Sequence, residues 1–197
     1  MNSAVQQPKW KKPEYSRSQI TKAGKTLRKS NVSDEEFANA IKVIDNWRAS
    51  HAFPLHVIYM HLRRMRRSEE RRVGKESRTD IIIAERLKRL DSIMSKLKRE
   101  SAMNLWGMQD LGGCRVVVPT IESVYEFAEK FEKSRKRHIR NNIYDYIQSP
   151  KESGYRSLHV VYEYKSDRSN VYNKNMLIEI QFRTHLQHLW ATTVETM

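Results

Sequence analysis

The segments GYRSLHVVYEY at residues 154–164 and MLIEIQFRT at residues 176–184 decide the fold class. Each alternates polar or aromatic side chains with apolar ones, which is the period of a β-strand buried on one face. We therefore expect strands over residues 155–164 and 176–182, joined by the polar loop 165–175. An ordinary half-exposed antiparallel pair also has a polar face, but the crowding of functional groups here favours a site. The side chains on that face are Tyr155, Ser157, His159, Glu179, Gln181 and Arg183.

Other segments supply the remaining layers of the expected domain. CRVVV at residues 114–118 predicts a core strand, followed by a helix over residues 121–131, and residues 184–195 predict a last helix. Ahead of them we expect a short basic helix over residues 16–29, a helix capped by Ser33 in a capping box with Glu36, and a helix over residues 55–65. The basic stretch 66–78 has no apolar periodicity and predicts a mobile loop. The fold class is therefore α/β (α+β), a mixed central β-sheet flanked by helices.

Residues 80–99 carry an apolar stripe with helical spacing, formed by Ile83, Leu87, Leu90, Met94 and Leu97. On a helix these side chains fall within an arc of about 80°. Lys88, Ser92 and Lys96 then fall in a separate arc, and eight residues of helix extend roughly 12 Å. Such a row of cations matches an extended triphosphate, although a solvent-exposed basic face gives the same pattern.

Charge is concentrated in two segments of this 197-residue chain, whose net charge is +14. Residues 1–30 and residues 61–100 each carry a net charge of +7, and the remaining segments sum to zero. Two basic regions on a neutral body are typical of a protein with a polyanionic partner, such as nucleic acid or nucleotide phosphates. A solvated basic surface is the alternative.

The composition bounds the class of protein. With 39% hydrophobic residues the chain can bury one core, and it has no apolar run long enough to span a membrane and no signal-peptide pattern. One cysteine, Cys114, excludes an internal disulfide and a cysteine-built zinc site. We expect a cytoplasmic protein with a basic, partly mobile N-terminal extension at residues 1–30 and one domain over residues 31–197.

Four motifs follow one another in register. They are R-x-K-x-x-x-S-x-x-x-K from Arg86 to Lys96, D-x-x-G-x-R from Asp110 to Arg115, D-Y-I-x-x-P-K-x-x-G-Y-x-S-L-H from Asp145 to His159, and E-I-Q-x-R-T from Glu179 to Thr184. In this order and spacing the chain resembles the synthetase domain of RelA/SpoT alarmone synthetases, over residues 80–195. The resemblance implies a nucleotidyltransferase-like fold that ends here short of the C-terminal part of the family.

The resemblance also implies an activity and roles for single residues. These enzymes move the β,γ-pyrophosphate of ATP onto a ribose hydroxyl, so charge neutralisation and positioning dominate catalysis. The implied Mg²⁺ ligands are Asp110 and Glu179, and the implied catalytic residues add Tyr155, Lys88 and Gln181. ATP would contact Arg86, Lys88, Ser92, Lys96 and Arg115, with Arg86 also able to stack on adenine. The acceptor would contact Lys151, Gly154, Tyr155, Ser157, His159 and Arg183, with Tyr155 stacked on its base.

Some of these positions have simpler explanations. Arg115 is also consistent with a strand end in water, and Ser92 with a small packing residue. His185 and His188 on the last predicted helix are as consistent with surface or core histidines as with a functional role. The chain contains no His-Asp dipeptide of the kind found in the family's hydrolase domain, so synthesis without hydrolysis is expected.

The acceptor divides the small relatives into two groups, and the sequence favours one. One group makes (p)ppGpp from GDP or GTP, whereas members of the toxic, toxin–antitoxin branch modify the 3′ CCA adenosine of tRNA and stop translation. The segments 15–27, 46–55 and 187–196 resemble the toxic branch, and broad basic patches suit tRNA. An antitoxin protein or fused antitoxin domain would then be a partner. A non-catalytic RNA-binding module is a third possibility. The candidate tRNA-binding residues are Lys9, Lys11, Lys12, Arg28, Lys29, Arg63, Arg64, Arg66 and Arg67.

Overall fold

A five-stranded mixed β-sheet organises the chain in a computed structural model, which describes residues 10–73, 80–134 and 137–194. The strands lie in the order β1-β2-β5-β4-β3. Strands β2 and β5 are parallel, and the other neighbouring pairs are antiparallel. The strands are β1 (Ile82–Leu87), β2 (Gly112–Val118), β3 (Ile139–Asp145), β4 (Leu158–Glu163) and β5 (Leu177–Thr184). The expected fold class, a mixed sheet flanked by helices, is confirmed.

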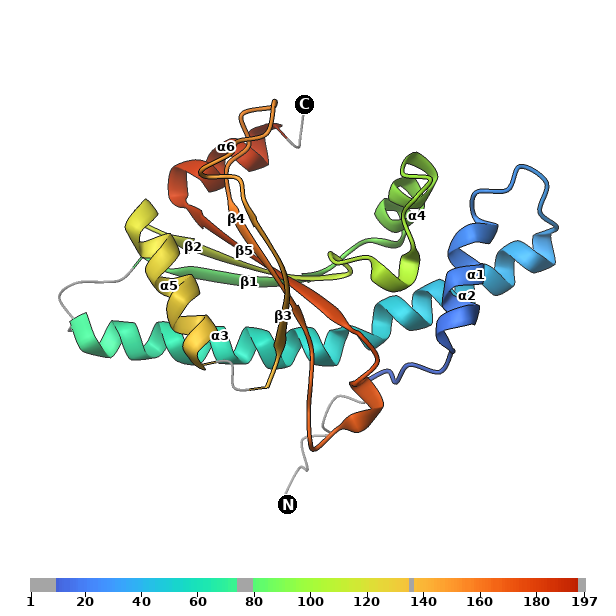
Figure 1. The fold of residues 1–197 in the computed structure, drawn as a ribbon, viewed down its shortest axis with the longest axis horizontal. Coiled ribbons are helices and arrows are strands. Elements are labelled where there is room, and N and C mark those ends of the chain that lie inside the picture. Colours follow the sequence, from blue (N-terminus) through green and yellow to red (C-terminus); the bar gives the residue numbers. More distant parts are fainter. Residues whose placement is uncertain (1–9, 74–79, 135–136, 195–197) are drawn as a thin grey trace, which may run out of the picture.

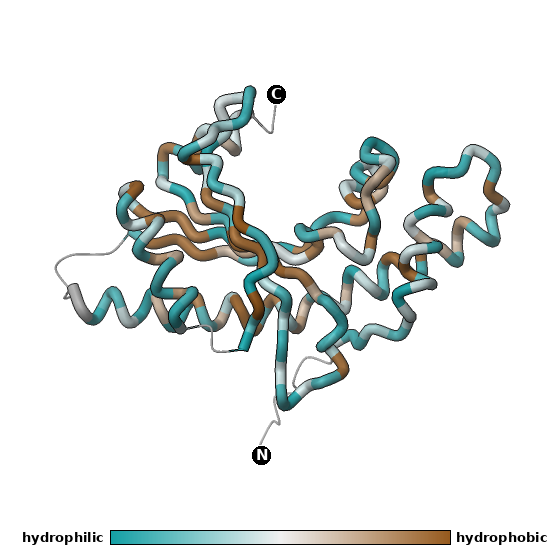
Figure 2. Tube along the Cα trace, in the orientation of Figure 1, coloured by the Kyte–Doolittle hydropathy of each residue, from teal (hydrophilic) through white to brown (hydrophobic). Residues whose placement is uncertain are grey.

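Two helices, α3 (Ala52–Val73) and α5 (Ile121–Ser134), cover one face of this sheet (Figure 1). The alternating apolar side chains of the strands point to that face, and Figure 2 shows them as the most hydrophobic part of the trace. The buried strand residues of this core are Cys114, Val116, Val118, Leu158, Val160, Tyr162, Ile178, Ile180 and Phe182. Helix α6 (His185–Val194) lies on the other side of the sheet from α3 and leaves the opposite face partly open.

A second apolar cluster holds the N-terminal helices against the end of the sheet. It joins α1 (Arg17–Thr26), α2 (Asp34–Ser50), α4 (Leu90–Arg99) and the short helices η1 (Leu105–Gly107) and η2 (Asn170–Tyr172). Trp47 is fully buried there and stacks on Trp106, with ring centroids 4.7 Å apart. The chain enters this cluster early, because Trp10 packs edge-on against Phe53. Residues 10–29 are thus packed onto the domain.

Serine side chains cap two of these helices, and the sequence predicts the cap at Ser33. Ser33 accepts a hydrogen bond from the backbone N–H of Glu36 at the start of α2. Ser16 and Gln19 form a reciprocal capping box at the start of α1. Capping satisfies backbone donors that the first turn leaves without helical partners.

The helix expected over residues 80–99 is wrong. Residues 82–87 form strand β1, which pairs with β2, and helix α4 begins only at Leu90. Lys88 therefore lies between a strand and a helix, and the expected helical row from Lys88 to Lys96 does not exist. The apolar side chains Ile83 and Leu87 still pack against the core, because residues four apart share a face in both a strand and a helix.

Both expected ends of α3 also change, and one further strand is found. Helix α3 continues through residues 66–73, where the sequence suggested a loop, and residues 74–79 lie outside the described part of the chain. The same helix begins at Ala52 and not at residue 55, and Pro54 lies in its first turn, where a missing N–H costs nothing. Strand β3 was not expected. Among the described residues no helix is both long and apolar enough to cross a membrane.

His51, between α2 and α3, makes stability depend on pH. Its side chain is 1% exposed, and its Nδ1 donates a hydrogen bond to the Trp47 carbonyl at 2.7 Å. Burial lowers its pKa from 6.5 to about 4, outweighing that hydrogen bond. Between these pH values the unfolded state binds a proton that the folded state does not, so stability falls as pH falls.

We expect urea denaturation to show a larger loss of stability from pH 7 to pH 5 in the natural chain than in His51→Asn, by ~2 kcal/mol. The variant keeps a donor for the Trp47 carbonyl but has no titrating ring. Equal losses in the two proteins would show that His51 does not titrate in this range.

Candidate active site

The parallel pairing of β2 and β5 brings the two candidate metal carboxylates to the open face of the sheet. Asp110 lies in the turn just before β2, and Glu179 is the third residue of β5, paired in register with Gly113. Both carboxylates line the same two hollows, each of about 520 Å³. Residues 69 positions apart in sequence therefore meet because two neighbouring strands run in the same direction.

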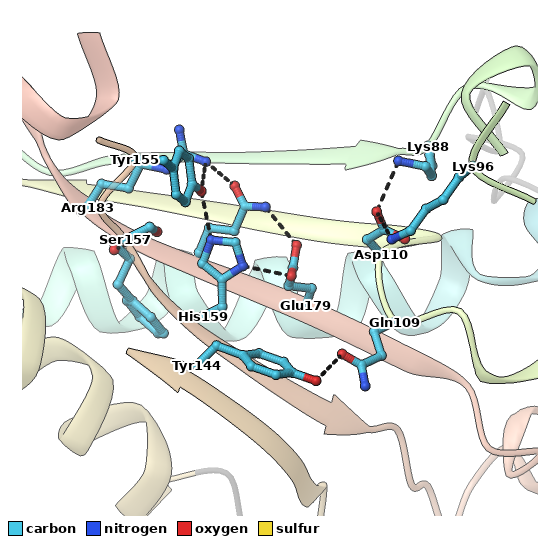
Figure 3. A network of polar contacts seen from close by, with 12 residues as sticks. Lys88, Lys96, Gln109, Asp110, Tyr144, Tyr155, Ser157, His159, Glu179 and Arg183 are labelled. Carbon is cyan, nitrogen blue, oxygen red and sulfur yellow. Dashed lines mark hydrogen bonds and ion pairs between the residues drawn. The ribbon is translucent and has the colours of Figure 1, made fainter. Parts of the chain in front are cut away.

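Asp110 is held by two lysines (Figure 3). Its Oδ2 lies 3.0 Å from Lys88 Nζ and 3.2 Å from Lys96 Nζ. Lys88 is placed by the β1–β2 register, since its backbone N–H donates to the Leu111 carbonyl. Burial would raise the pKa of Asp110, but the charges and hydrogen bonds of Lys88 and Lys96 outweigh it and lower the pKa. Asp110 is therefore ionised at neutral pH.

Glu179 lies in a second polar network on the same face. Its Oε1 accepts a hydrogen bond from His159 Nδ1 at 2.8 Å, and its Oε2 accepts one from Gln181 Nε2 at 2.7 Å. Burial would raise the pKa of Glu179, but the hydrogen bond and charge of His159, with the Gln181 amide, lower it despite the nearby charge of Asp110. An ionised carboxylate only accepts, so Nδ1 of His159 carries a proton.

Tyr155 closes this network on the side away from Asp110. Its hydroxyl lies 2.7 Å from His159 Nε2 and accepts a hydrogen bond from Arg183 at 2.9 Å. Arg183 also donates to the Gln181 amide oxygen, and its guanidinium carbon lies 5.2 Å from the Tyr155 ring centroid. Arg183 is 1% exposed, so it braces the tyrosine from below.

The first hollow is aromatic and lies between α4 and α6. Its walls include Lys96 from one helix, Trp190 from the other, and Tyr155 from the loop before β4.

Sequence reasoning missed Tyr144 and Tyr146, which also line the first hollow. They are two residues apart, so a strand period would have placed them on one face, but β3 itself was not expected. The ring of Tyr146 makes edge contacts with His159.

Lys151 reaches the same hollow. Its ammonium lies 4.5 Å from the ring centroid of Tyr146 and 5.2 Å from that of Tyr155. The turn that carries it closes when the Gly154 N–H donates to the Lys151 carbonyl, with Gly154 at φ +75°. A cation beside two half-buried aromatic rings that line the hollow suits a ligand with a flat base and a negative charge.

The second hollow lies over β1 and β2 and holds more cationic side chains. Arg86, Lys88 and Arg115 line it together with Glu85 and the two candidate metal carboxylates. Gly113 on β2 pairs with Arg86 on β1 and with Glu179 on β5, so it lies between these two residues. A Cβ built there meets only backbone oxygens, at 3.8 and 4.0 Å, so the absence of a side chain leaves this space open.

Four expected site residues do not line the first or the second hollow, namely Ser92, Gly154, Ser157 and Arg183. Ser92 sits one turn before Lys96 on α4 and is not among the residues that line either hollow. Ser157 is fully buried and donates to the Phe182 carbonyl, so its side chain reaches neither hollow. It ties the start of β4 to β5. His185 contacts the Asp80 carbonyl through Nε2, and His188 lies on the same helix α6.

The structure separates the candidate tRNA-binding residues into distinct places. Arg28 donates to the carbonyls of Leu97, Glu100 and Met103 and so holds the end of α4. Residues 63–67 lie on α3, which packs on the face of the sheet opposite the hollows. Among the N-terminal candidates, the exposed ones are Lys11, Lys12 and Lys29, and Lys9 lies outside the described residues.

The donor set fits a magnesium ion. Asp110 Oδ1 is buried and has no hydrogen-bond partner, and the Glu179 carboxylate is ionised beside it. Mg²⁺ prefers carboxylate oxygens, usually one or two, and completes its shell with water and substrate phosphates. In the described part of the chain no group of three or more His, Cys, Asp or Glu side chains is arranged to hold a metal. Two carboxylates with phosphate ligands are therefore the arrangement that these residues allow.

The comparisons with known proteins point to one family. Residues 85–196 match the family described as "Region found in RelA / SpoT proteins". The chain is 34% identical over 109 residues to the GTP pyrophosphokinase YjbM of Bacillus subtilis, which covers 54% of this chain and 51% of that protein. It spans about half the length of the curated relatives that it matches.

Solved structures agree in fold. A GTP pyrophosphokinase family protein from Streptococcus pneumoniae superposes with a TM-score of 0.60 and 32% identity, over 72% of this chain and 70% of that one. The small alarmone synthetase 1 of Bacillus subtilis bound to its product pppGpp gives a TM-score of 0.51 and 31% identity, over 58% of this chain and 59% of that one.

Proposed function

The chain belongs to the RelA/SpoT family, and from that premise we propose that it is a pyrophosphokinase. It would transfer the β,γ-pyrophosphate of ATP to a ribose 3′-hydroxyl. The observation that carries this proposal is the pair of ionised carboxylates, Asp110 and Glu179, between a cationic hollow and an aromatic one. A reaction that moves a pyrophosphate group from one nucleotide to another needs two adjoining sites that share their reacting centre.

ATP is assigned to the cationic hollow. Arg86, Lys88 and Arg115 offer three cations there. Lys96 on α4 is ion-paired with Asp110, which lines the same hollow. In the structure Lys88 and Lys96 are paired with Asp110, and we infer that they turn to the phosphates when ATP binds. Phosphate oxygens carry more charge than one carboxylate and are the stronger partners. Ser92 stays a proposed ATP contact because it lies one turn before Lys96 on α4.

The acceptor is assigned to the aromatic hollow. Its base would stack on Tyr155, whose ring is fixed by His159 and Arg183, and Lys151 would meet a phosphate or the ribose. The hydroxyl oxygen would attack the β-phosphorus, and the bond from that phosphorus to the α,β-bridging oxygen would break to release AMP. Gln181 and His159 hold the Glu179 carboxylate in place for this step.

Asp110 and Glu179 would hold Mg²⁺, which neutralises charge on the transferred phosphates and makes the attacking hydroxyl more acidic when bound. The lowered pKa of Glu179 supports this role. A carboxylate with a low pKa stays ionised and binds a cation well, but it is a weak base for a hydroxyl proton. We therefore assign Glu179 to the metal and to orientation of the hydroxyl.

For the acceptor we favour the 3′ CCA adenosine of tRNA, which would make the protein an inhibitor of translation that requires a neutralising antitoxin. The basic segments support this choice. Arg17, Lys22 and Lys25 on α1 line a hollow of about 760 Å³, and Arg28, two residues after α1, donates to the Leu97 carbonyl at the end of α4. α1 and α4 share one apolar cluster, so the cations on α1 lie near the helix that carries Lys96 to the reacting centre.

A guanine nucleotide is the second candidate acceptor. It is favoured by the relatives that are called GTP pyrophosphokinases, and by the pppGpp product bound to the small alarmone synthetase 1 of Bacillus subtilis. In that case the protein would make (p)ppGpp, and the basic surfaces would have no role in the reaction.

Acceptor choice can be read from one experiment with ATP labelled on the β- and γ-phosphates. We expect label to enter deacylated tRNA faster than GDP or GTP. Raising salt from about 50 to 200 mM should lower transfer to tRNA at least tenfold more than transfer to the nucleotides, since tRNA binding releases more counterions. Label found only in ppGpp or pppGpp would overturn the tRNA proposal and leave the pyrophosphokinase standing.

A further inference from the structure

Helix α6 presents an apolar stripe to solvent beside the aromatic hollow. Leu186, Leu189 and Trp190 are 79%, 65% and 53% exposed. They are spaced i, i+3 and i+4, so they share one face of the helix. Exposed apolar groups gathered in this way usually mark a binding surface. No step in the proposed reaction with a single nucleotide uses Leu186 or Leu189.

This stripe lines a third hollow, of about 460 Å³, which shares a wall with the acceptor site. Trp190 lines both hollows. The other shared boundary is the segment from Gly154 to Arg156, in which Tyr155 faces the acceptor hollow while Gly154 and Arg156 face the third one. A Cβ built on Gly154 would lie 3.5 Å from the Trp190 ring, so the backbone there packs directly against the indole. The two hollows are therefore consecutive positions along one path.

The chemistry of the third hollow is that of a stacking platform with one cation. Its residues include no acidic side chain, and Arg156, which is exposed, is the charged residue among them. Single-stranded nucleic acids are bound by aromatic side chains that stack on bases and by cations that meet the phosphates between them. An indole, two leucines and one arginine match a base and its linking phosphate.

We propose that this third hollow binds the penultimate nucleotide of a single-stranded RNA 3′ end while the terminal nucleoside occupies the acceptor hollow. The penultimate base stacks on Trp190 beside Leu189, and Arg156 meets the phosphate that links the two nucleotides. This inference rests on the proposed function and narrows it, because a free mononucleotide has nothing to place in the third hollow.

The test compares acceptors of increasing length. Wild-type protein is assayed with 5′-AMP and with the oligonucleotides CpA and CpCpA, and we expect the second nucleotide to raise kcat/KM at least about tenfold, the stacking contribution of one base. The double variant Arg156→Gln/Leu189→Asn should lose that gain, so that its ratio of kcat/KM for CpA to that for AMP falls toward one. The control Arg168→Gln/Ile121→Asn makes the same chemical changes at exposed positions elsewhere and should keep the wild-type ratio.

Binding is measured separately, with fluorescent CpCpA that ends in 3′-deoxyadenosine and so cannot react. The double variant should bind it at least about tenfold more weakly than the control variant. Equal binding by the two variants, or an equal fall in kcat/KM for AMP and CpA, would overturn the inference. So would self-association of the wild-type chain, seen by light scattering, that the double variant loses without any change in RNA binding. Failure of transfer to every acceptor, with binding as expected, would instead overturn the proposed function.

Discussion

Asp110→Asn lowers pyrophosphate transfer on the order of 1,000-fold, the largest effect that we expect of a single substitution here. The amide keeps the shape of the side chain but removes the charge that would hold Mg²⁺. It also removes the partner of Lys88 and Lys96, which lie 3.0 and 3.2 Å from Asp110 Oδ2. With those two ammonium groups released, ATP in the absence of metal should bind the variant at least as tightly as it binds the natural chain.

Two measurements separate this role from a structural one. Transfer is followed with labelled ATP, and metal-free ATP binding is followed by calorimetry in the presence of a chelator. Asp167→Asn is the control, since Asp167 is also ion-paired, with Arg137, but lies in the loop between β4 and β5. Near-normal transfer by Asp110→Asn would contradict the assignment, and much weaker metal-free ATP binding would mean that the substitution had damaged the site.

Glu179→Gln should lower kcat about 100-fold or more with a much smaller effect on KM for the acceptor. The glutamine can still accept a hydrogen bond from His159 or Gln181, so the Tyr155 network that receives the base is largely kept. What disappears is the second negative charge at the reacting centre. Loss of kcat with retained acceptor binding is the signature of a group that acts mainly in the transition state.

The matched control for Glu179→Gln is Glu163→Gln. Glu163 ends β4 in the same sheet and is paired with Lys165 at 2.6 Å, so it is also a partly buried, ion-paired glutamate. Steady-state kinetics on the two variants should show the loss at position 179 alone. If both variants lose activity equally, the effect comes from the sheet and not from the charge at Glu179.

Much of the sheet was predictable because polar and apolar side chains alternate along its strands. Strand β5 follows from the apolar Ile178, Ile180 and Phe182, and the polar face opposite them places Glu179 and Gln181 on the open side. The error at β1 has a physical cause. Ile83 and Leu87 are four residues apart, a spacing that puts side chains on one face in both a helix and a strand. The pattern alone could not decide between them.

The failure to predict strand β3 has a different cause. Its sequence, IRNNIYD, has Asn141 and Asn142 at its centre and no regular apolar face, because β3 is an edge strand with largely exposed side chains. Without that strand, Tyr144 and Tyr146 could not be assigned to the acceptor hollow.

Long-range contacts set the rest of the site. Sequence motifs identified Asp110, Lys88 and Lys96, but their pairing depends on the β1–β2 register and on the position of α4. The position of Trp190 also depends on long-range contacts. It reaches the acceptor hollow only because α6 crosses back over the open face of the sheet. The sequence of α6 does not show which surface Trp190 faces.

The measurement that tests the central claim most directly counts the products of the wild-type chain incubated with ATP, Mg²⁺ and deacylated tRNA, with Asp110→Asn alongside. Mass spectrometry of the digested tRNA and chromatography of the nucleotides are read together. We predict one AMP released for each terminal adenosine that gains two phosphates, with both products absent from the variant. Release of ADP with gain of one phosphate, or equal AMP release by wild type and Asp110→Asn, would contradict pyrophosphate transfer at this site.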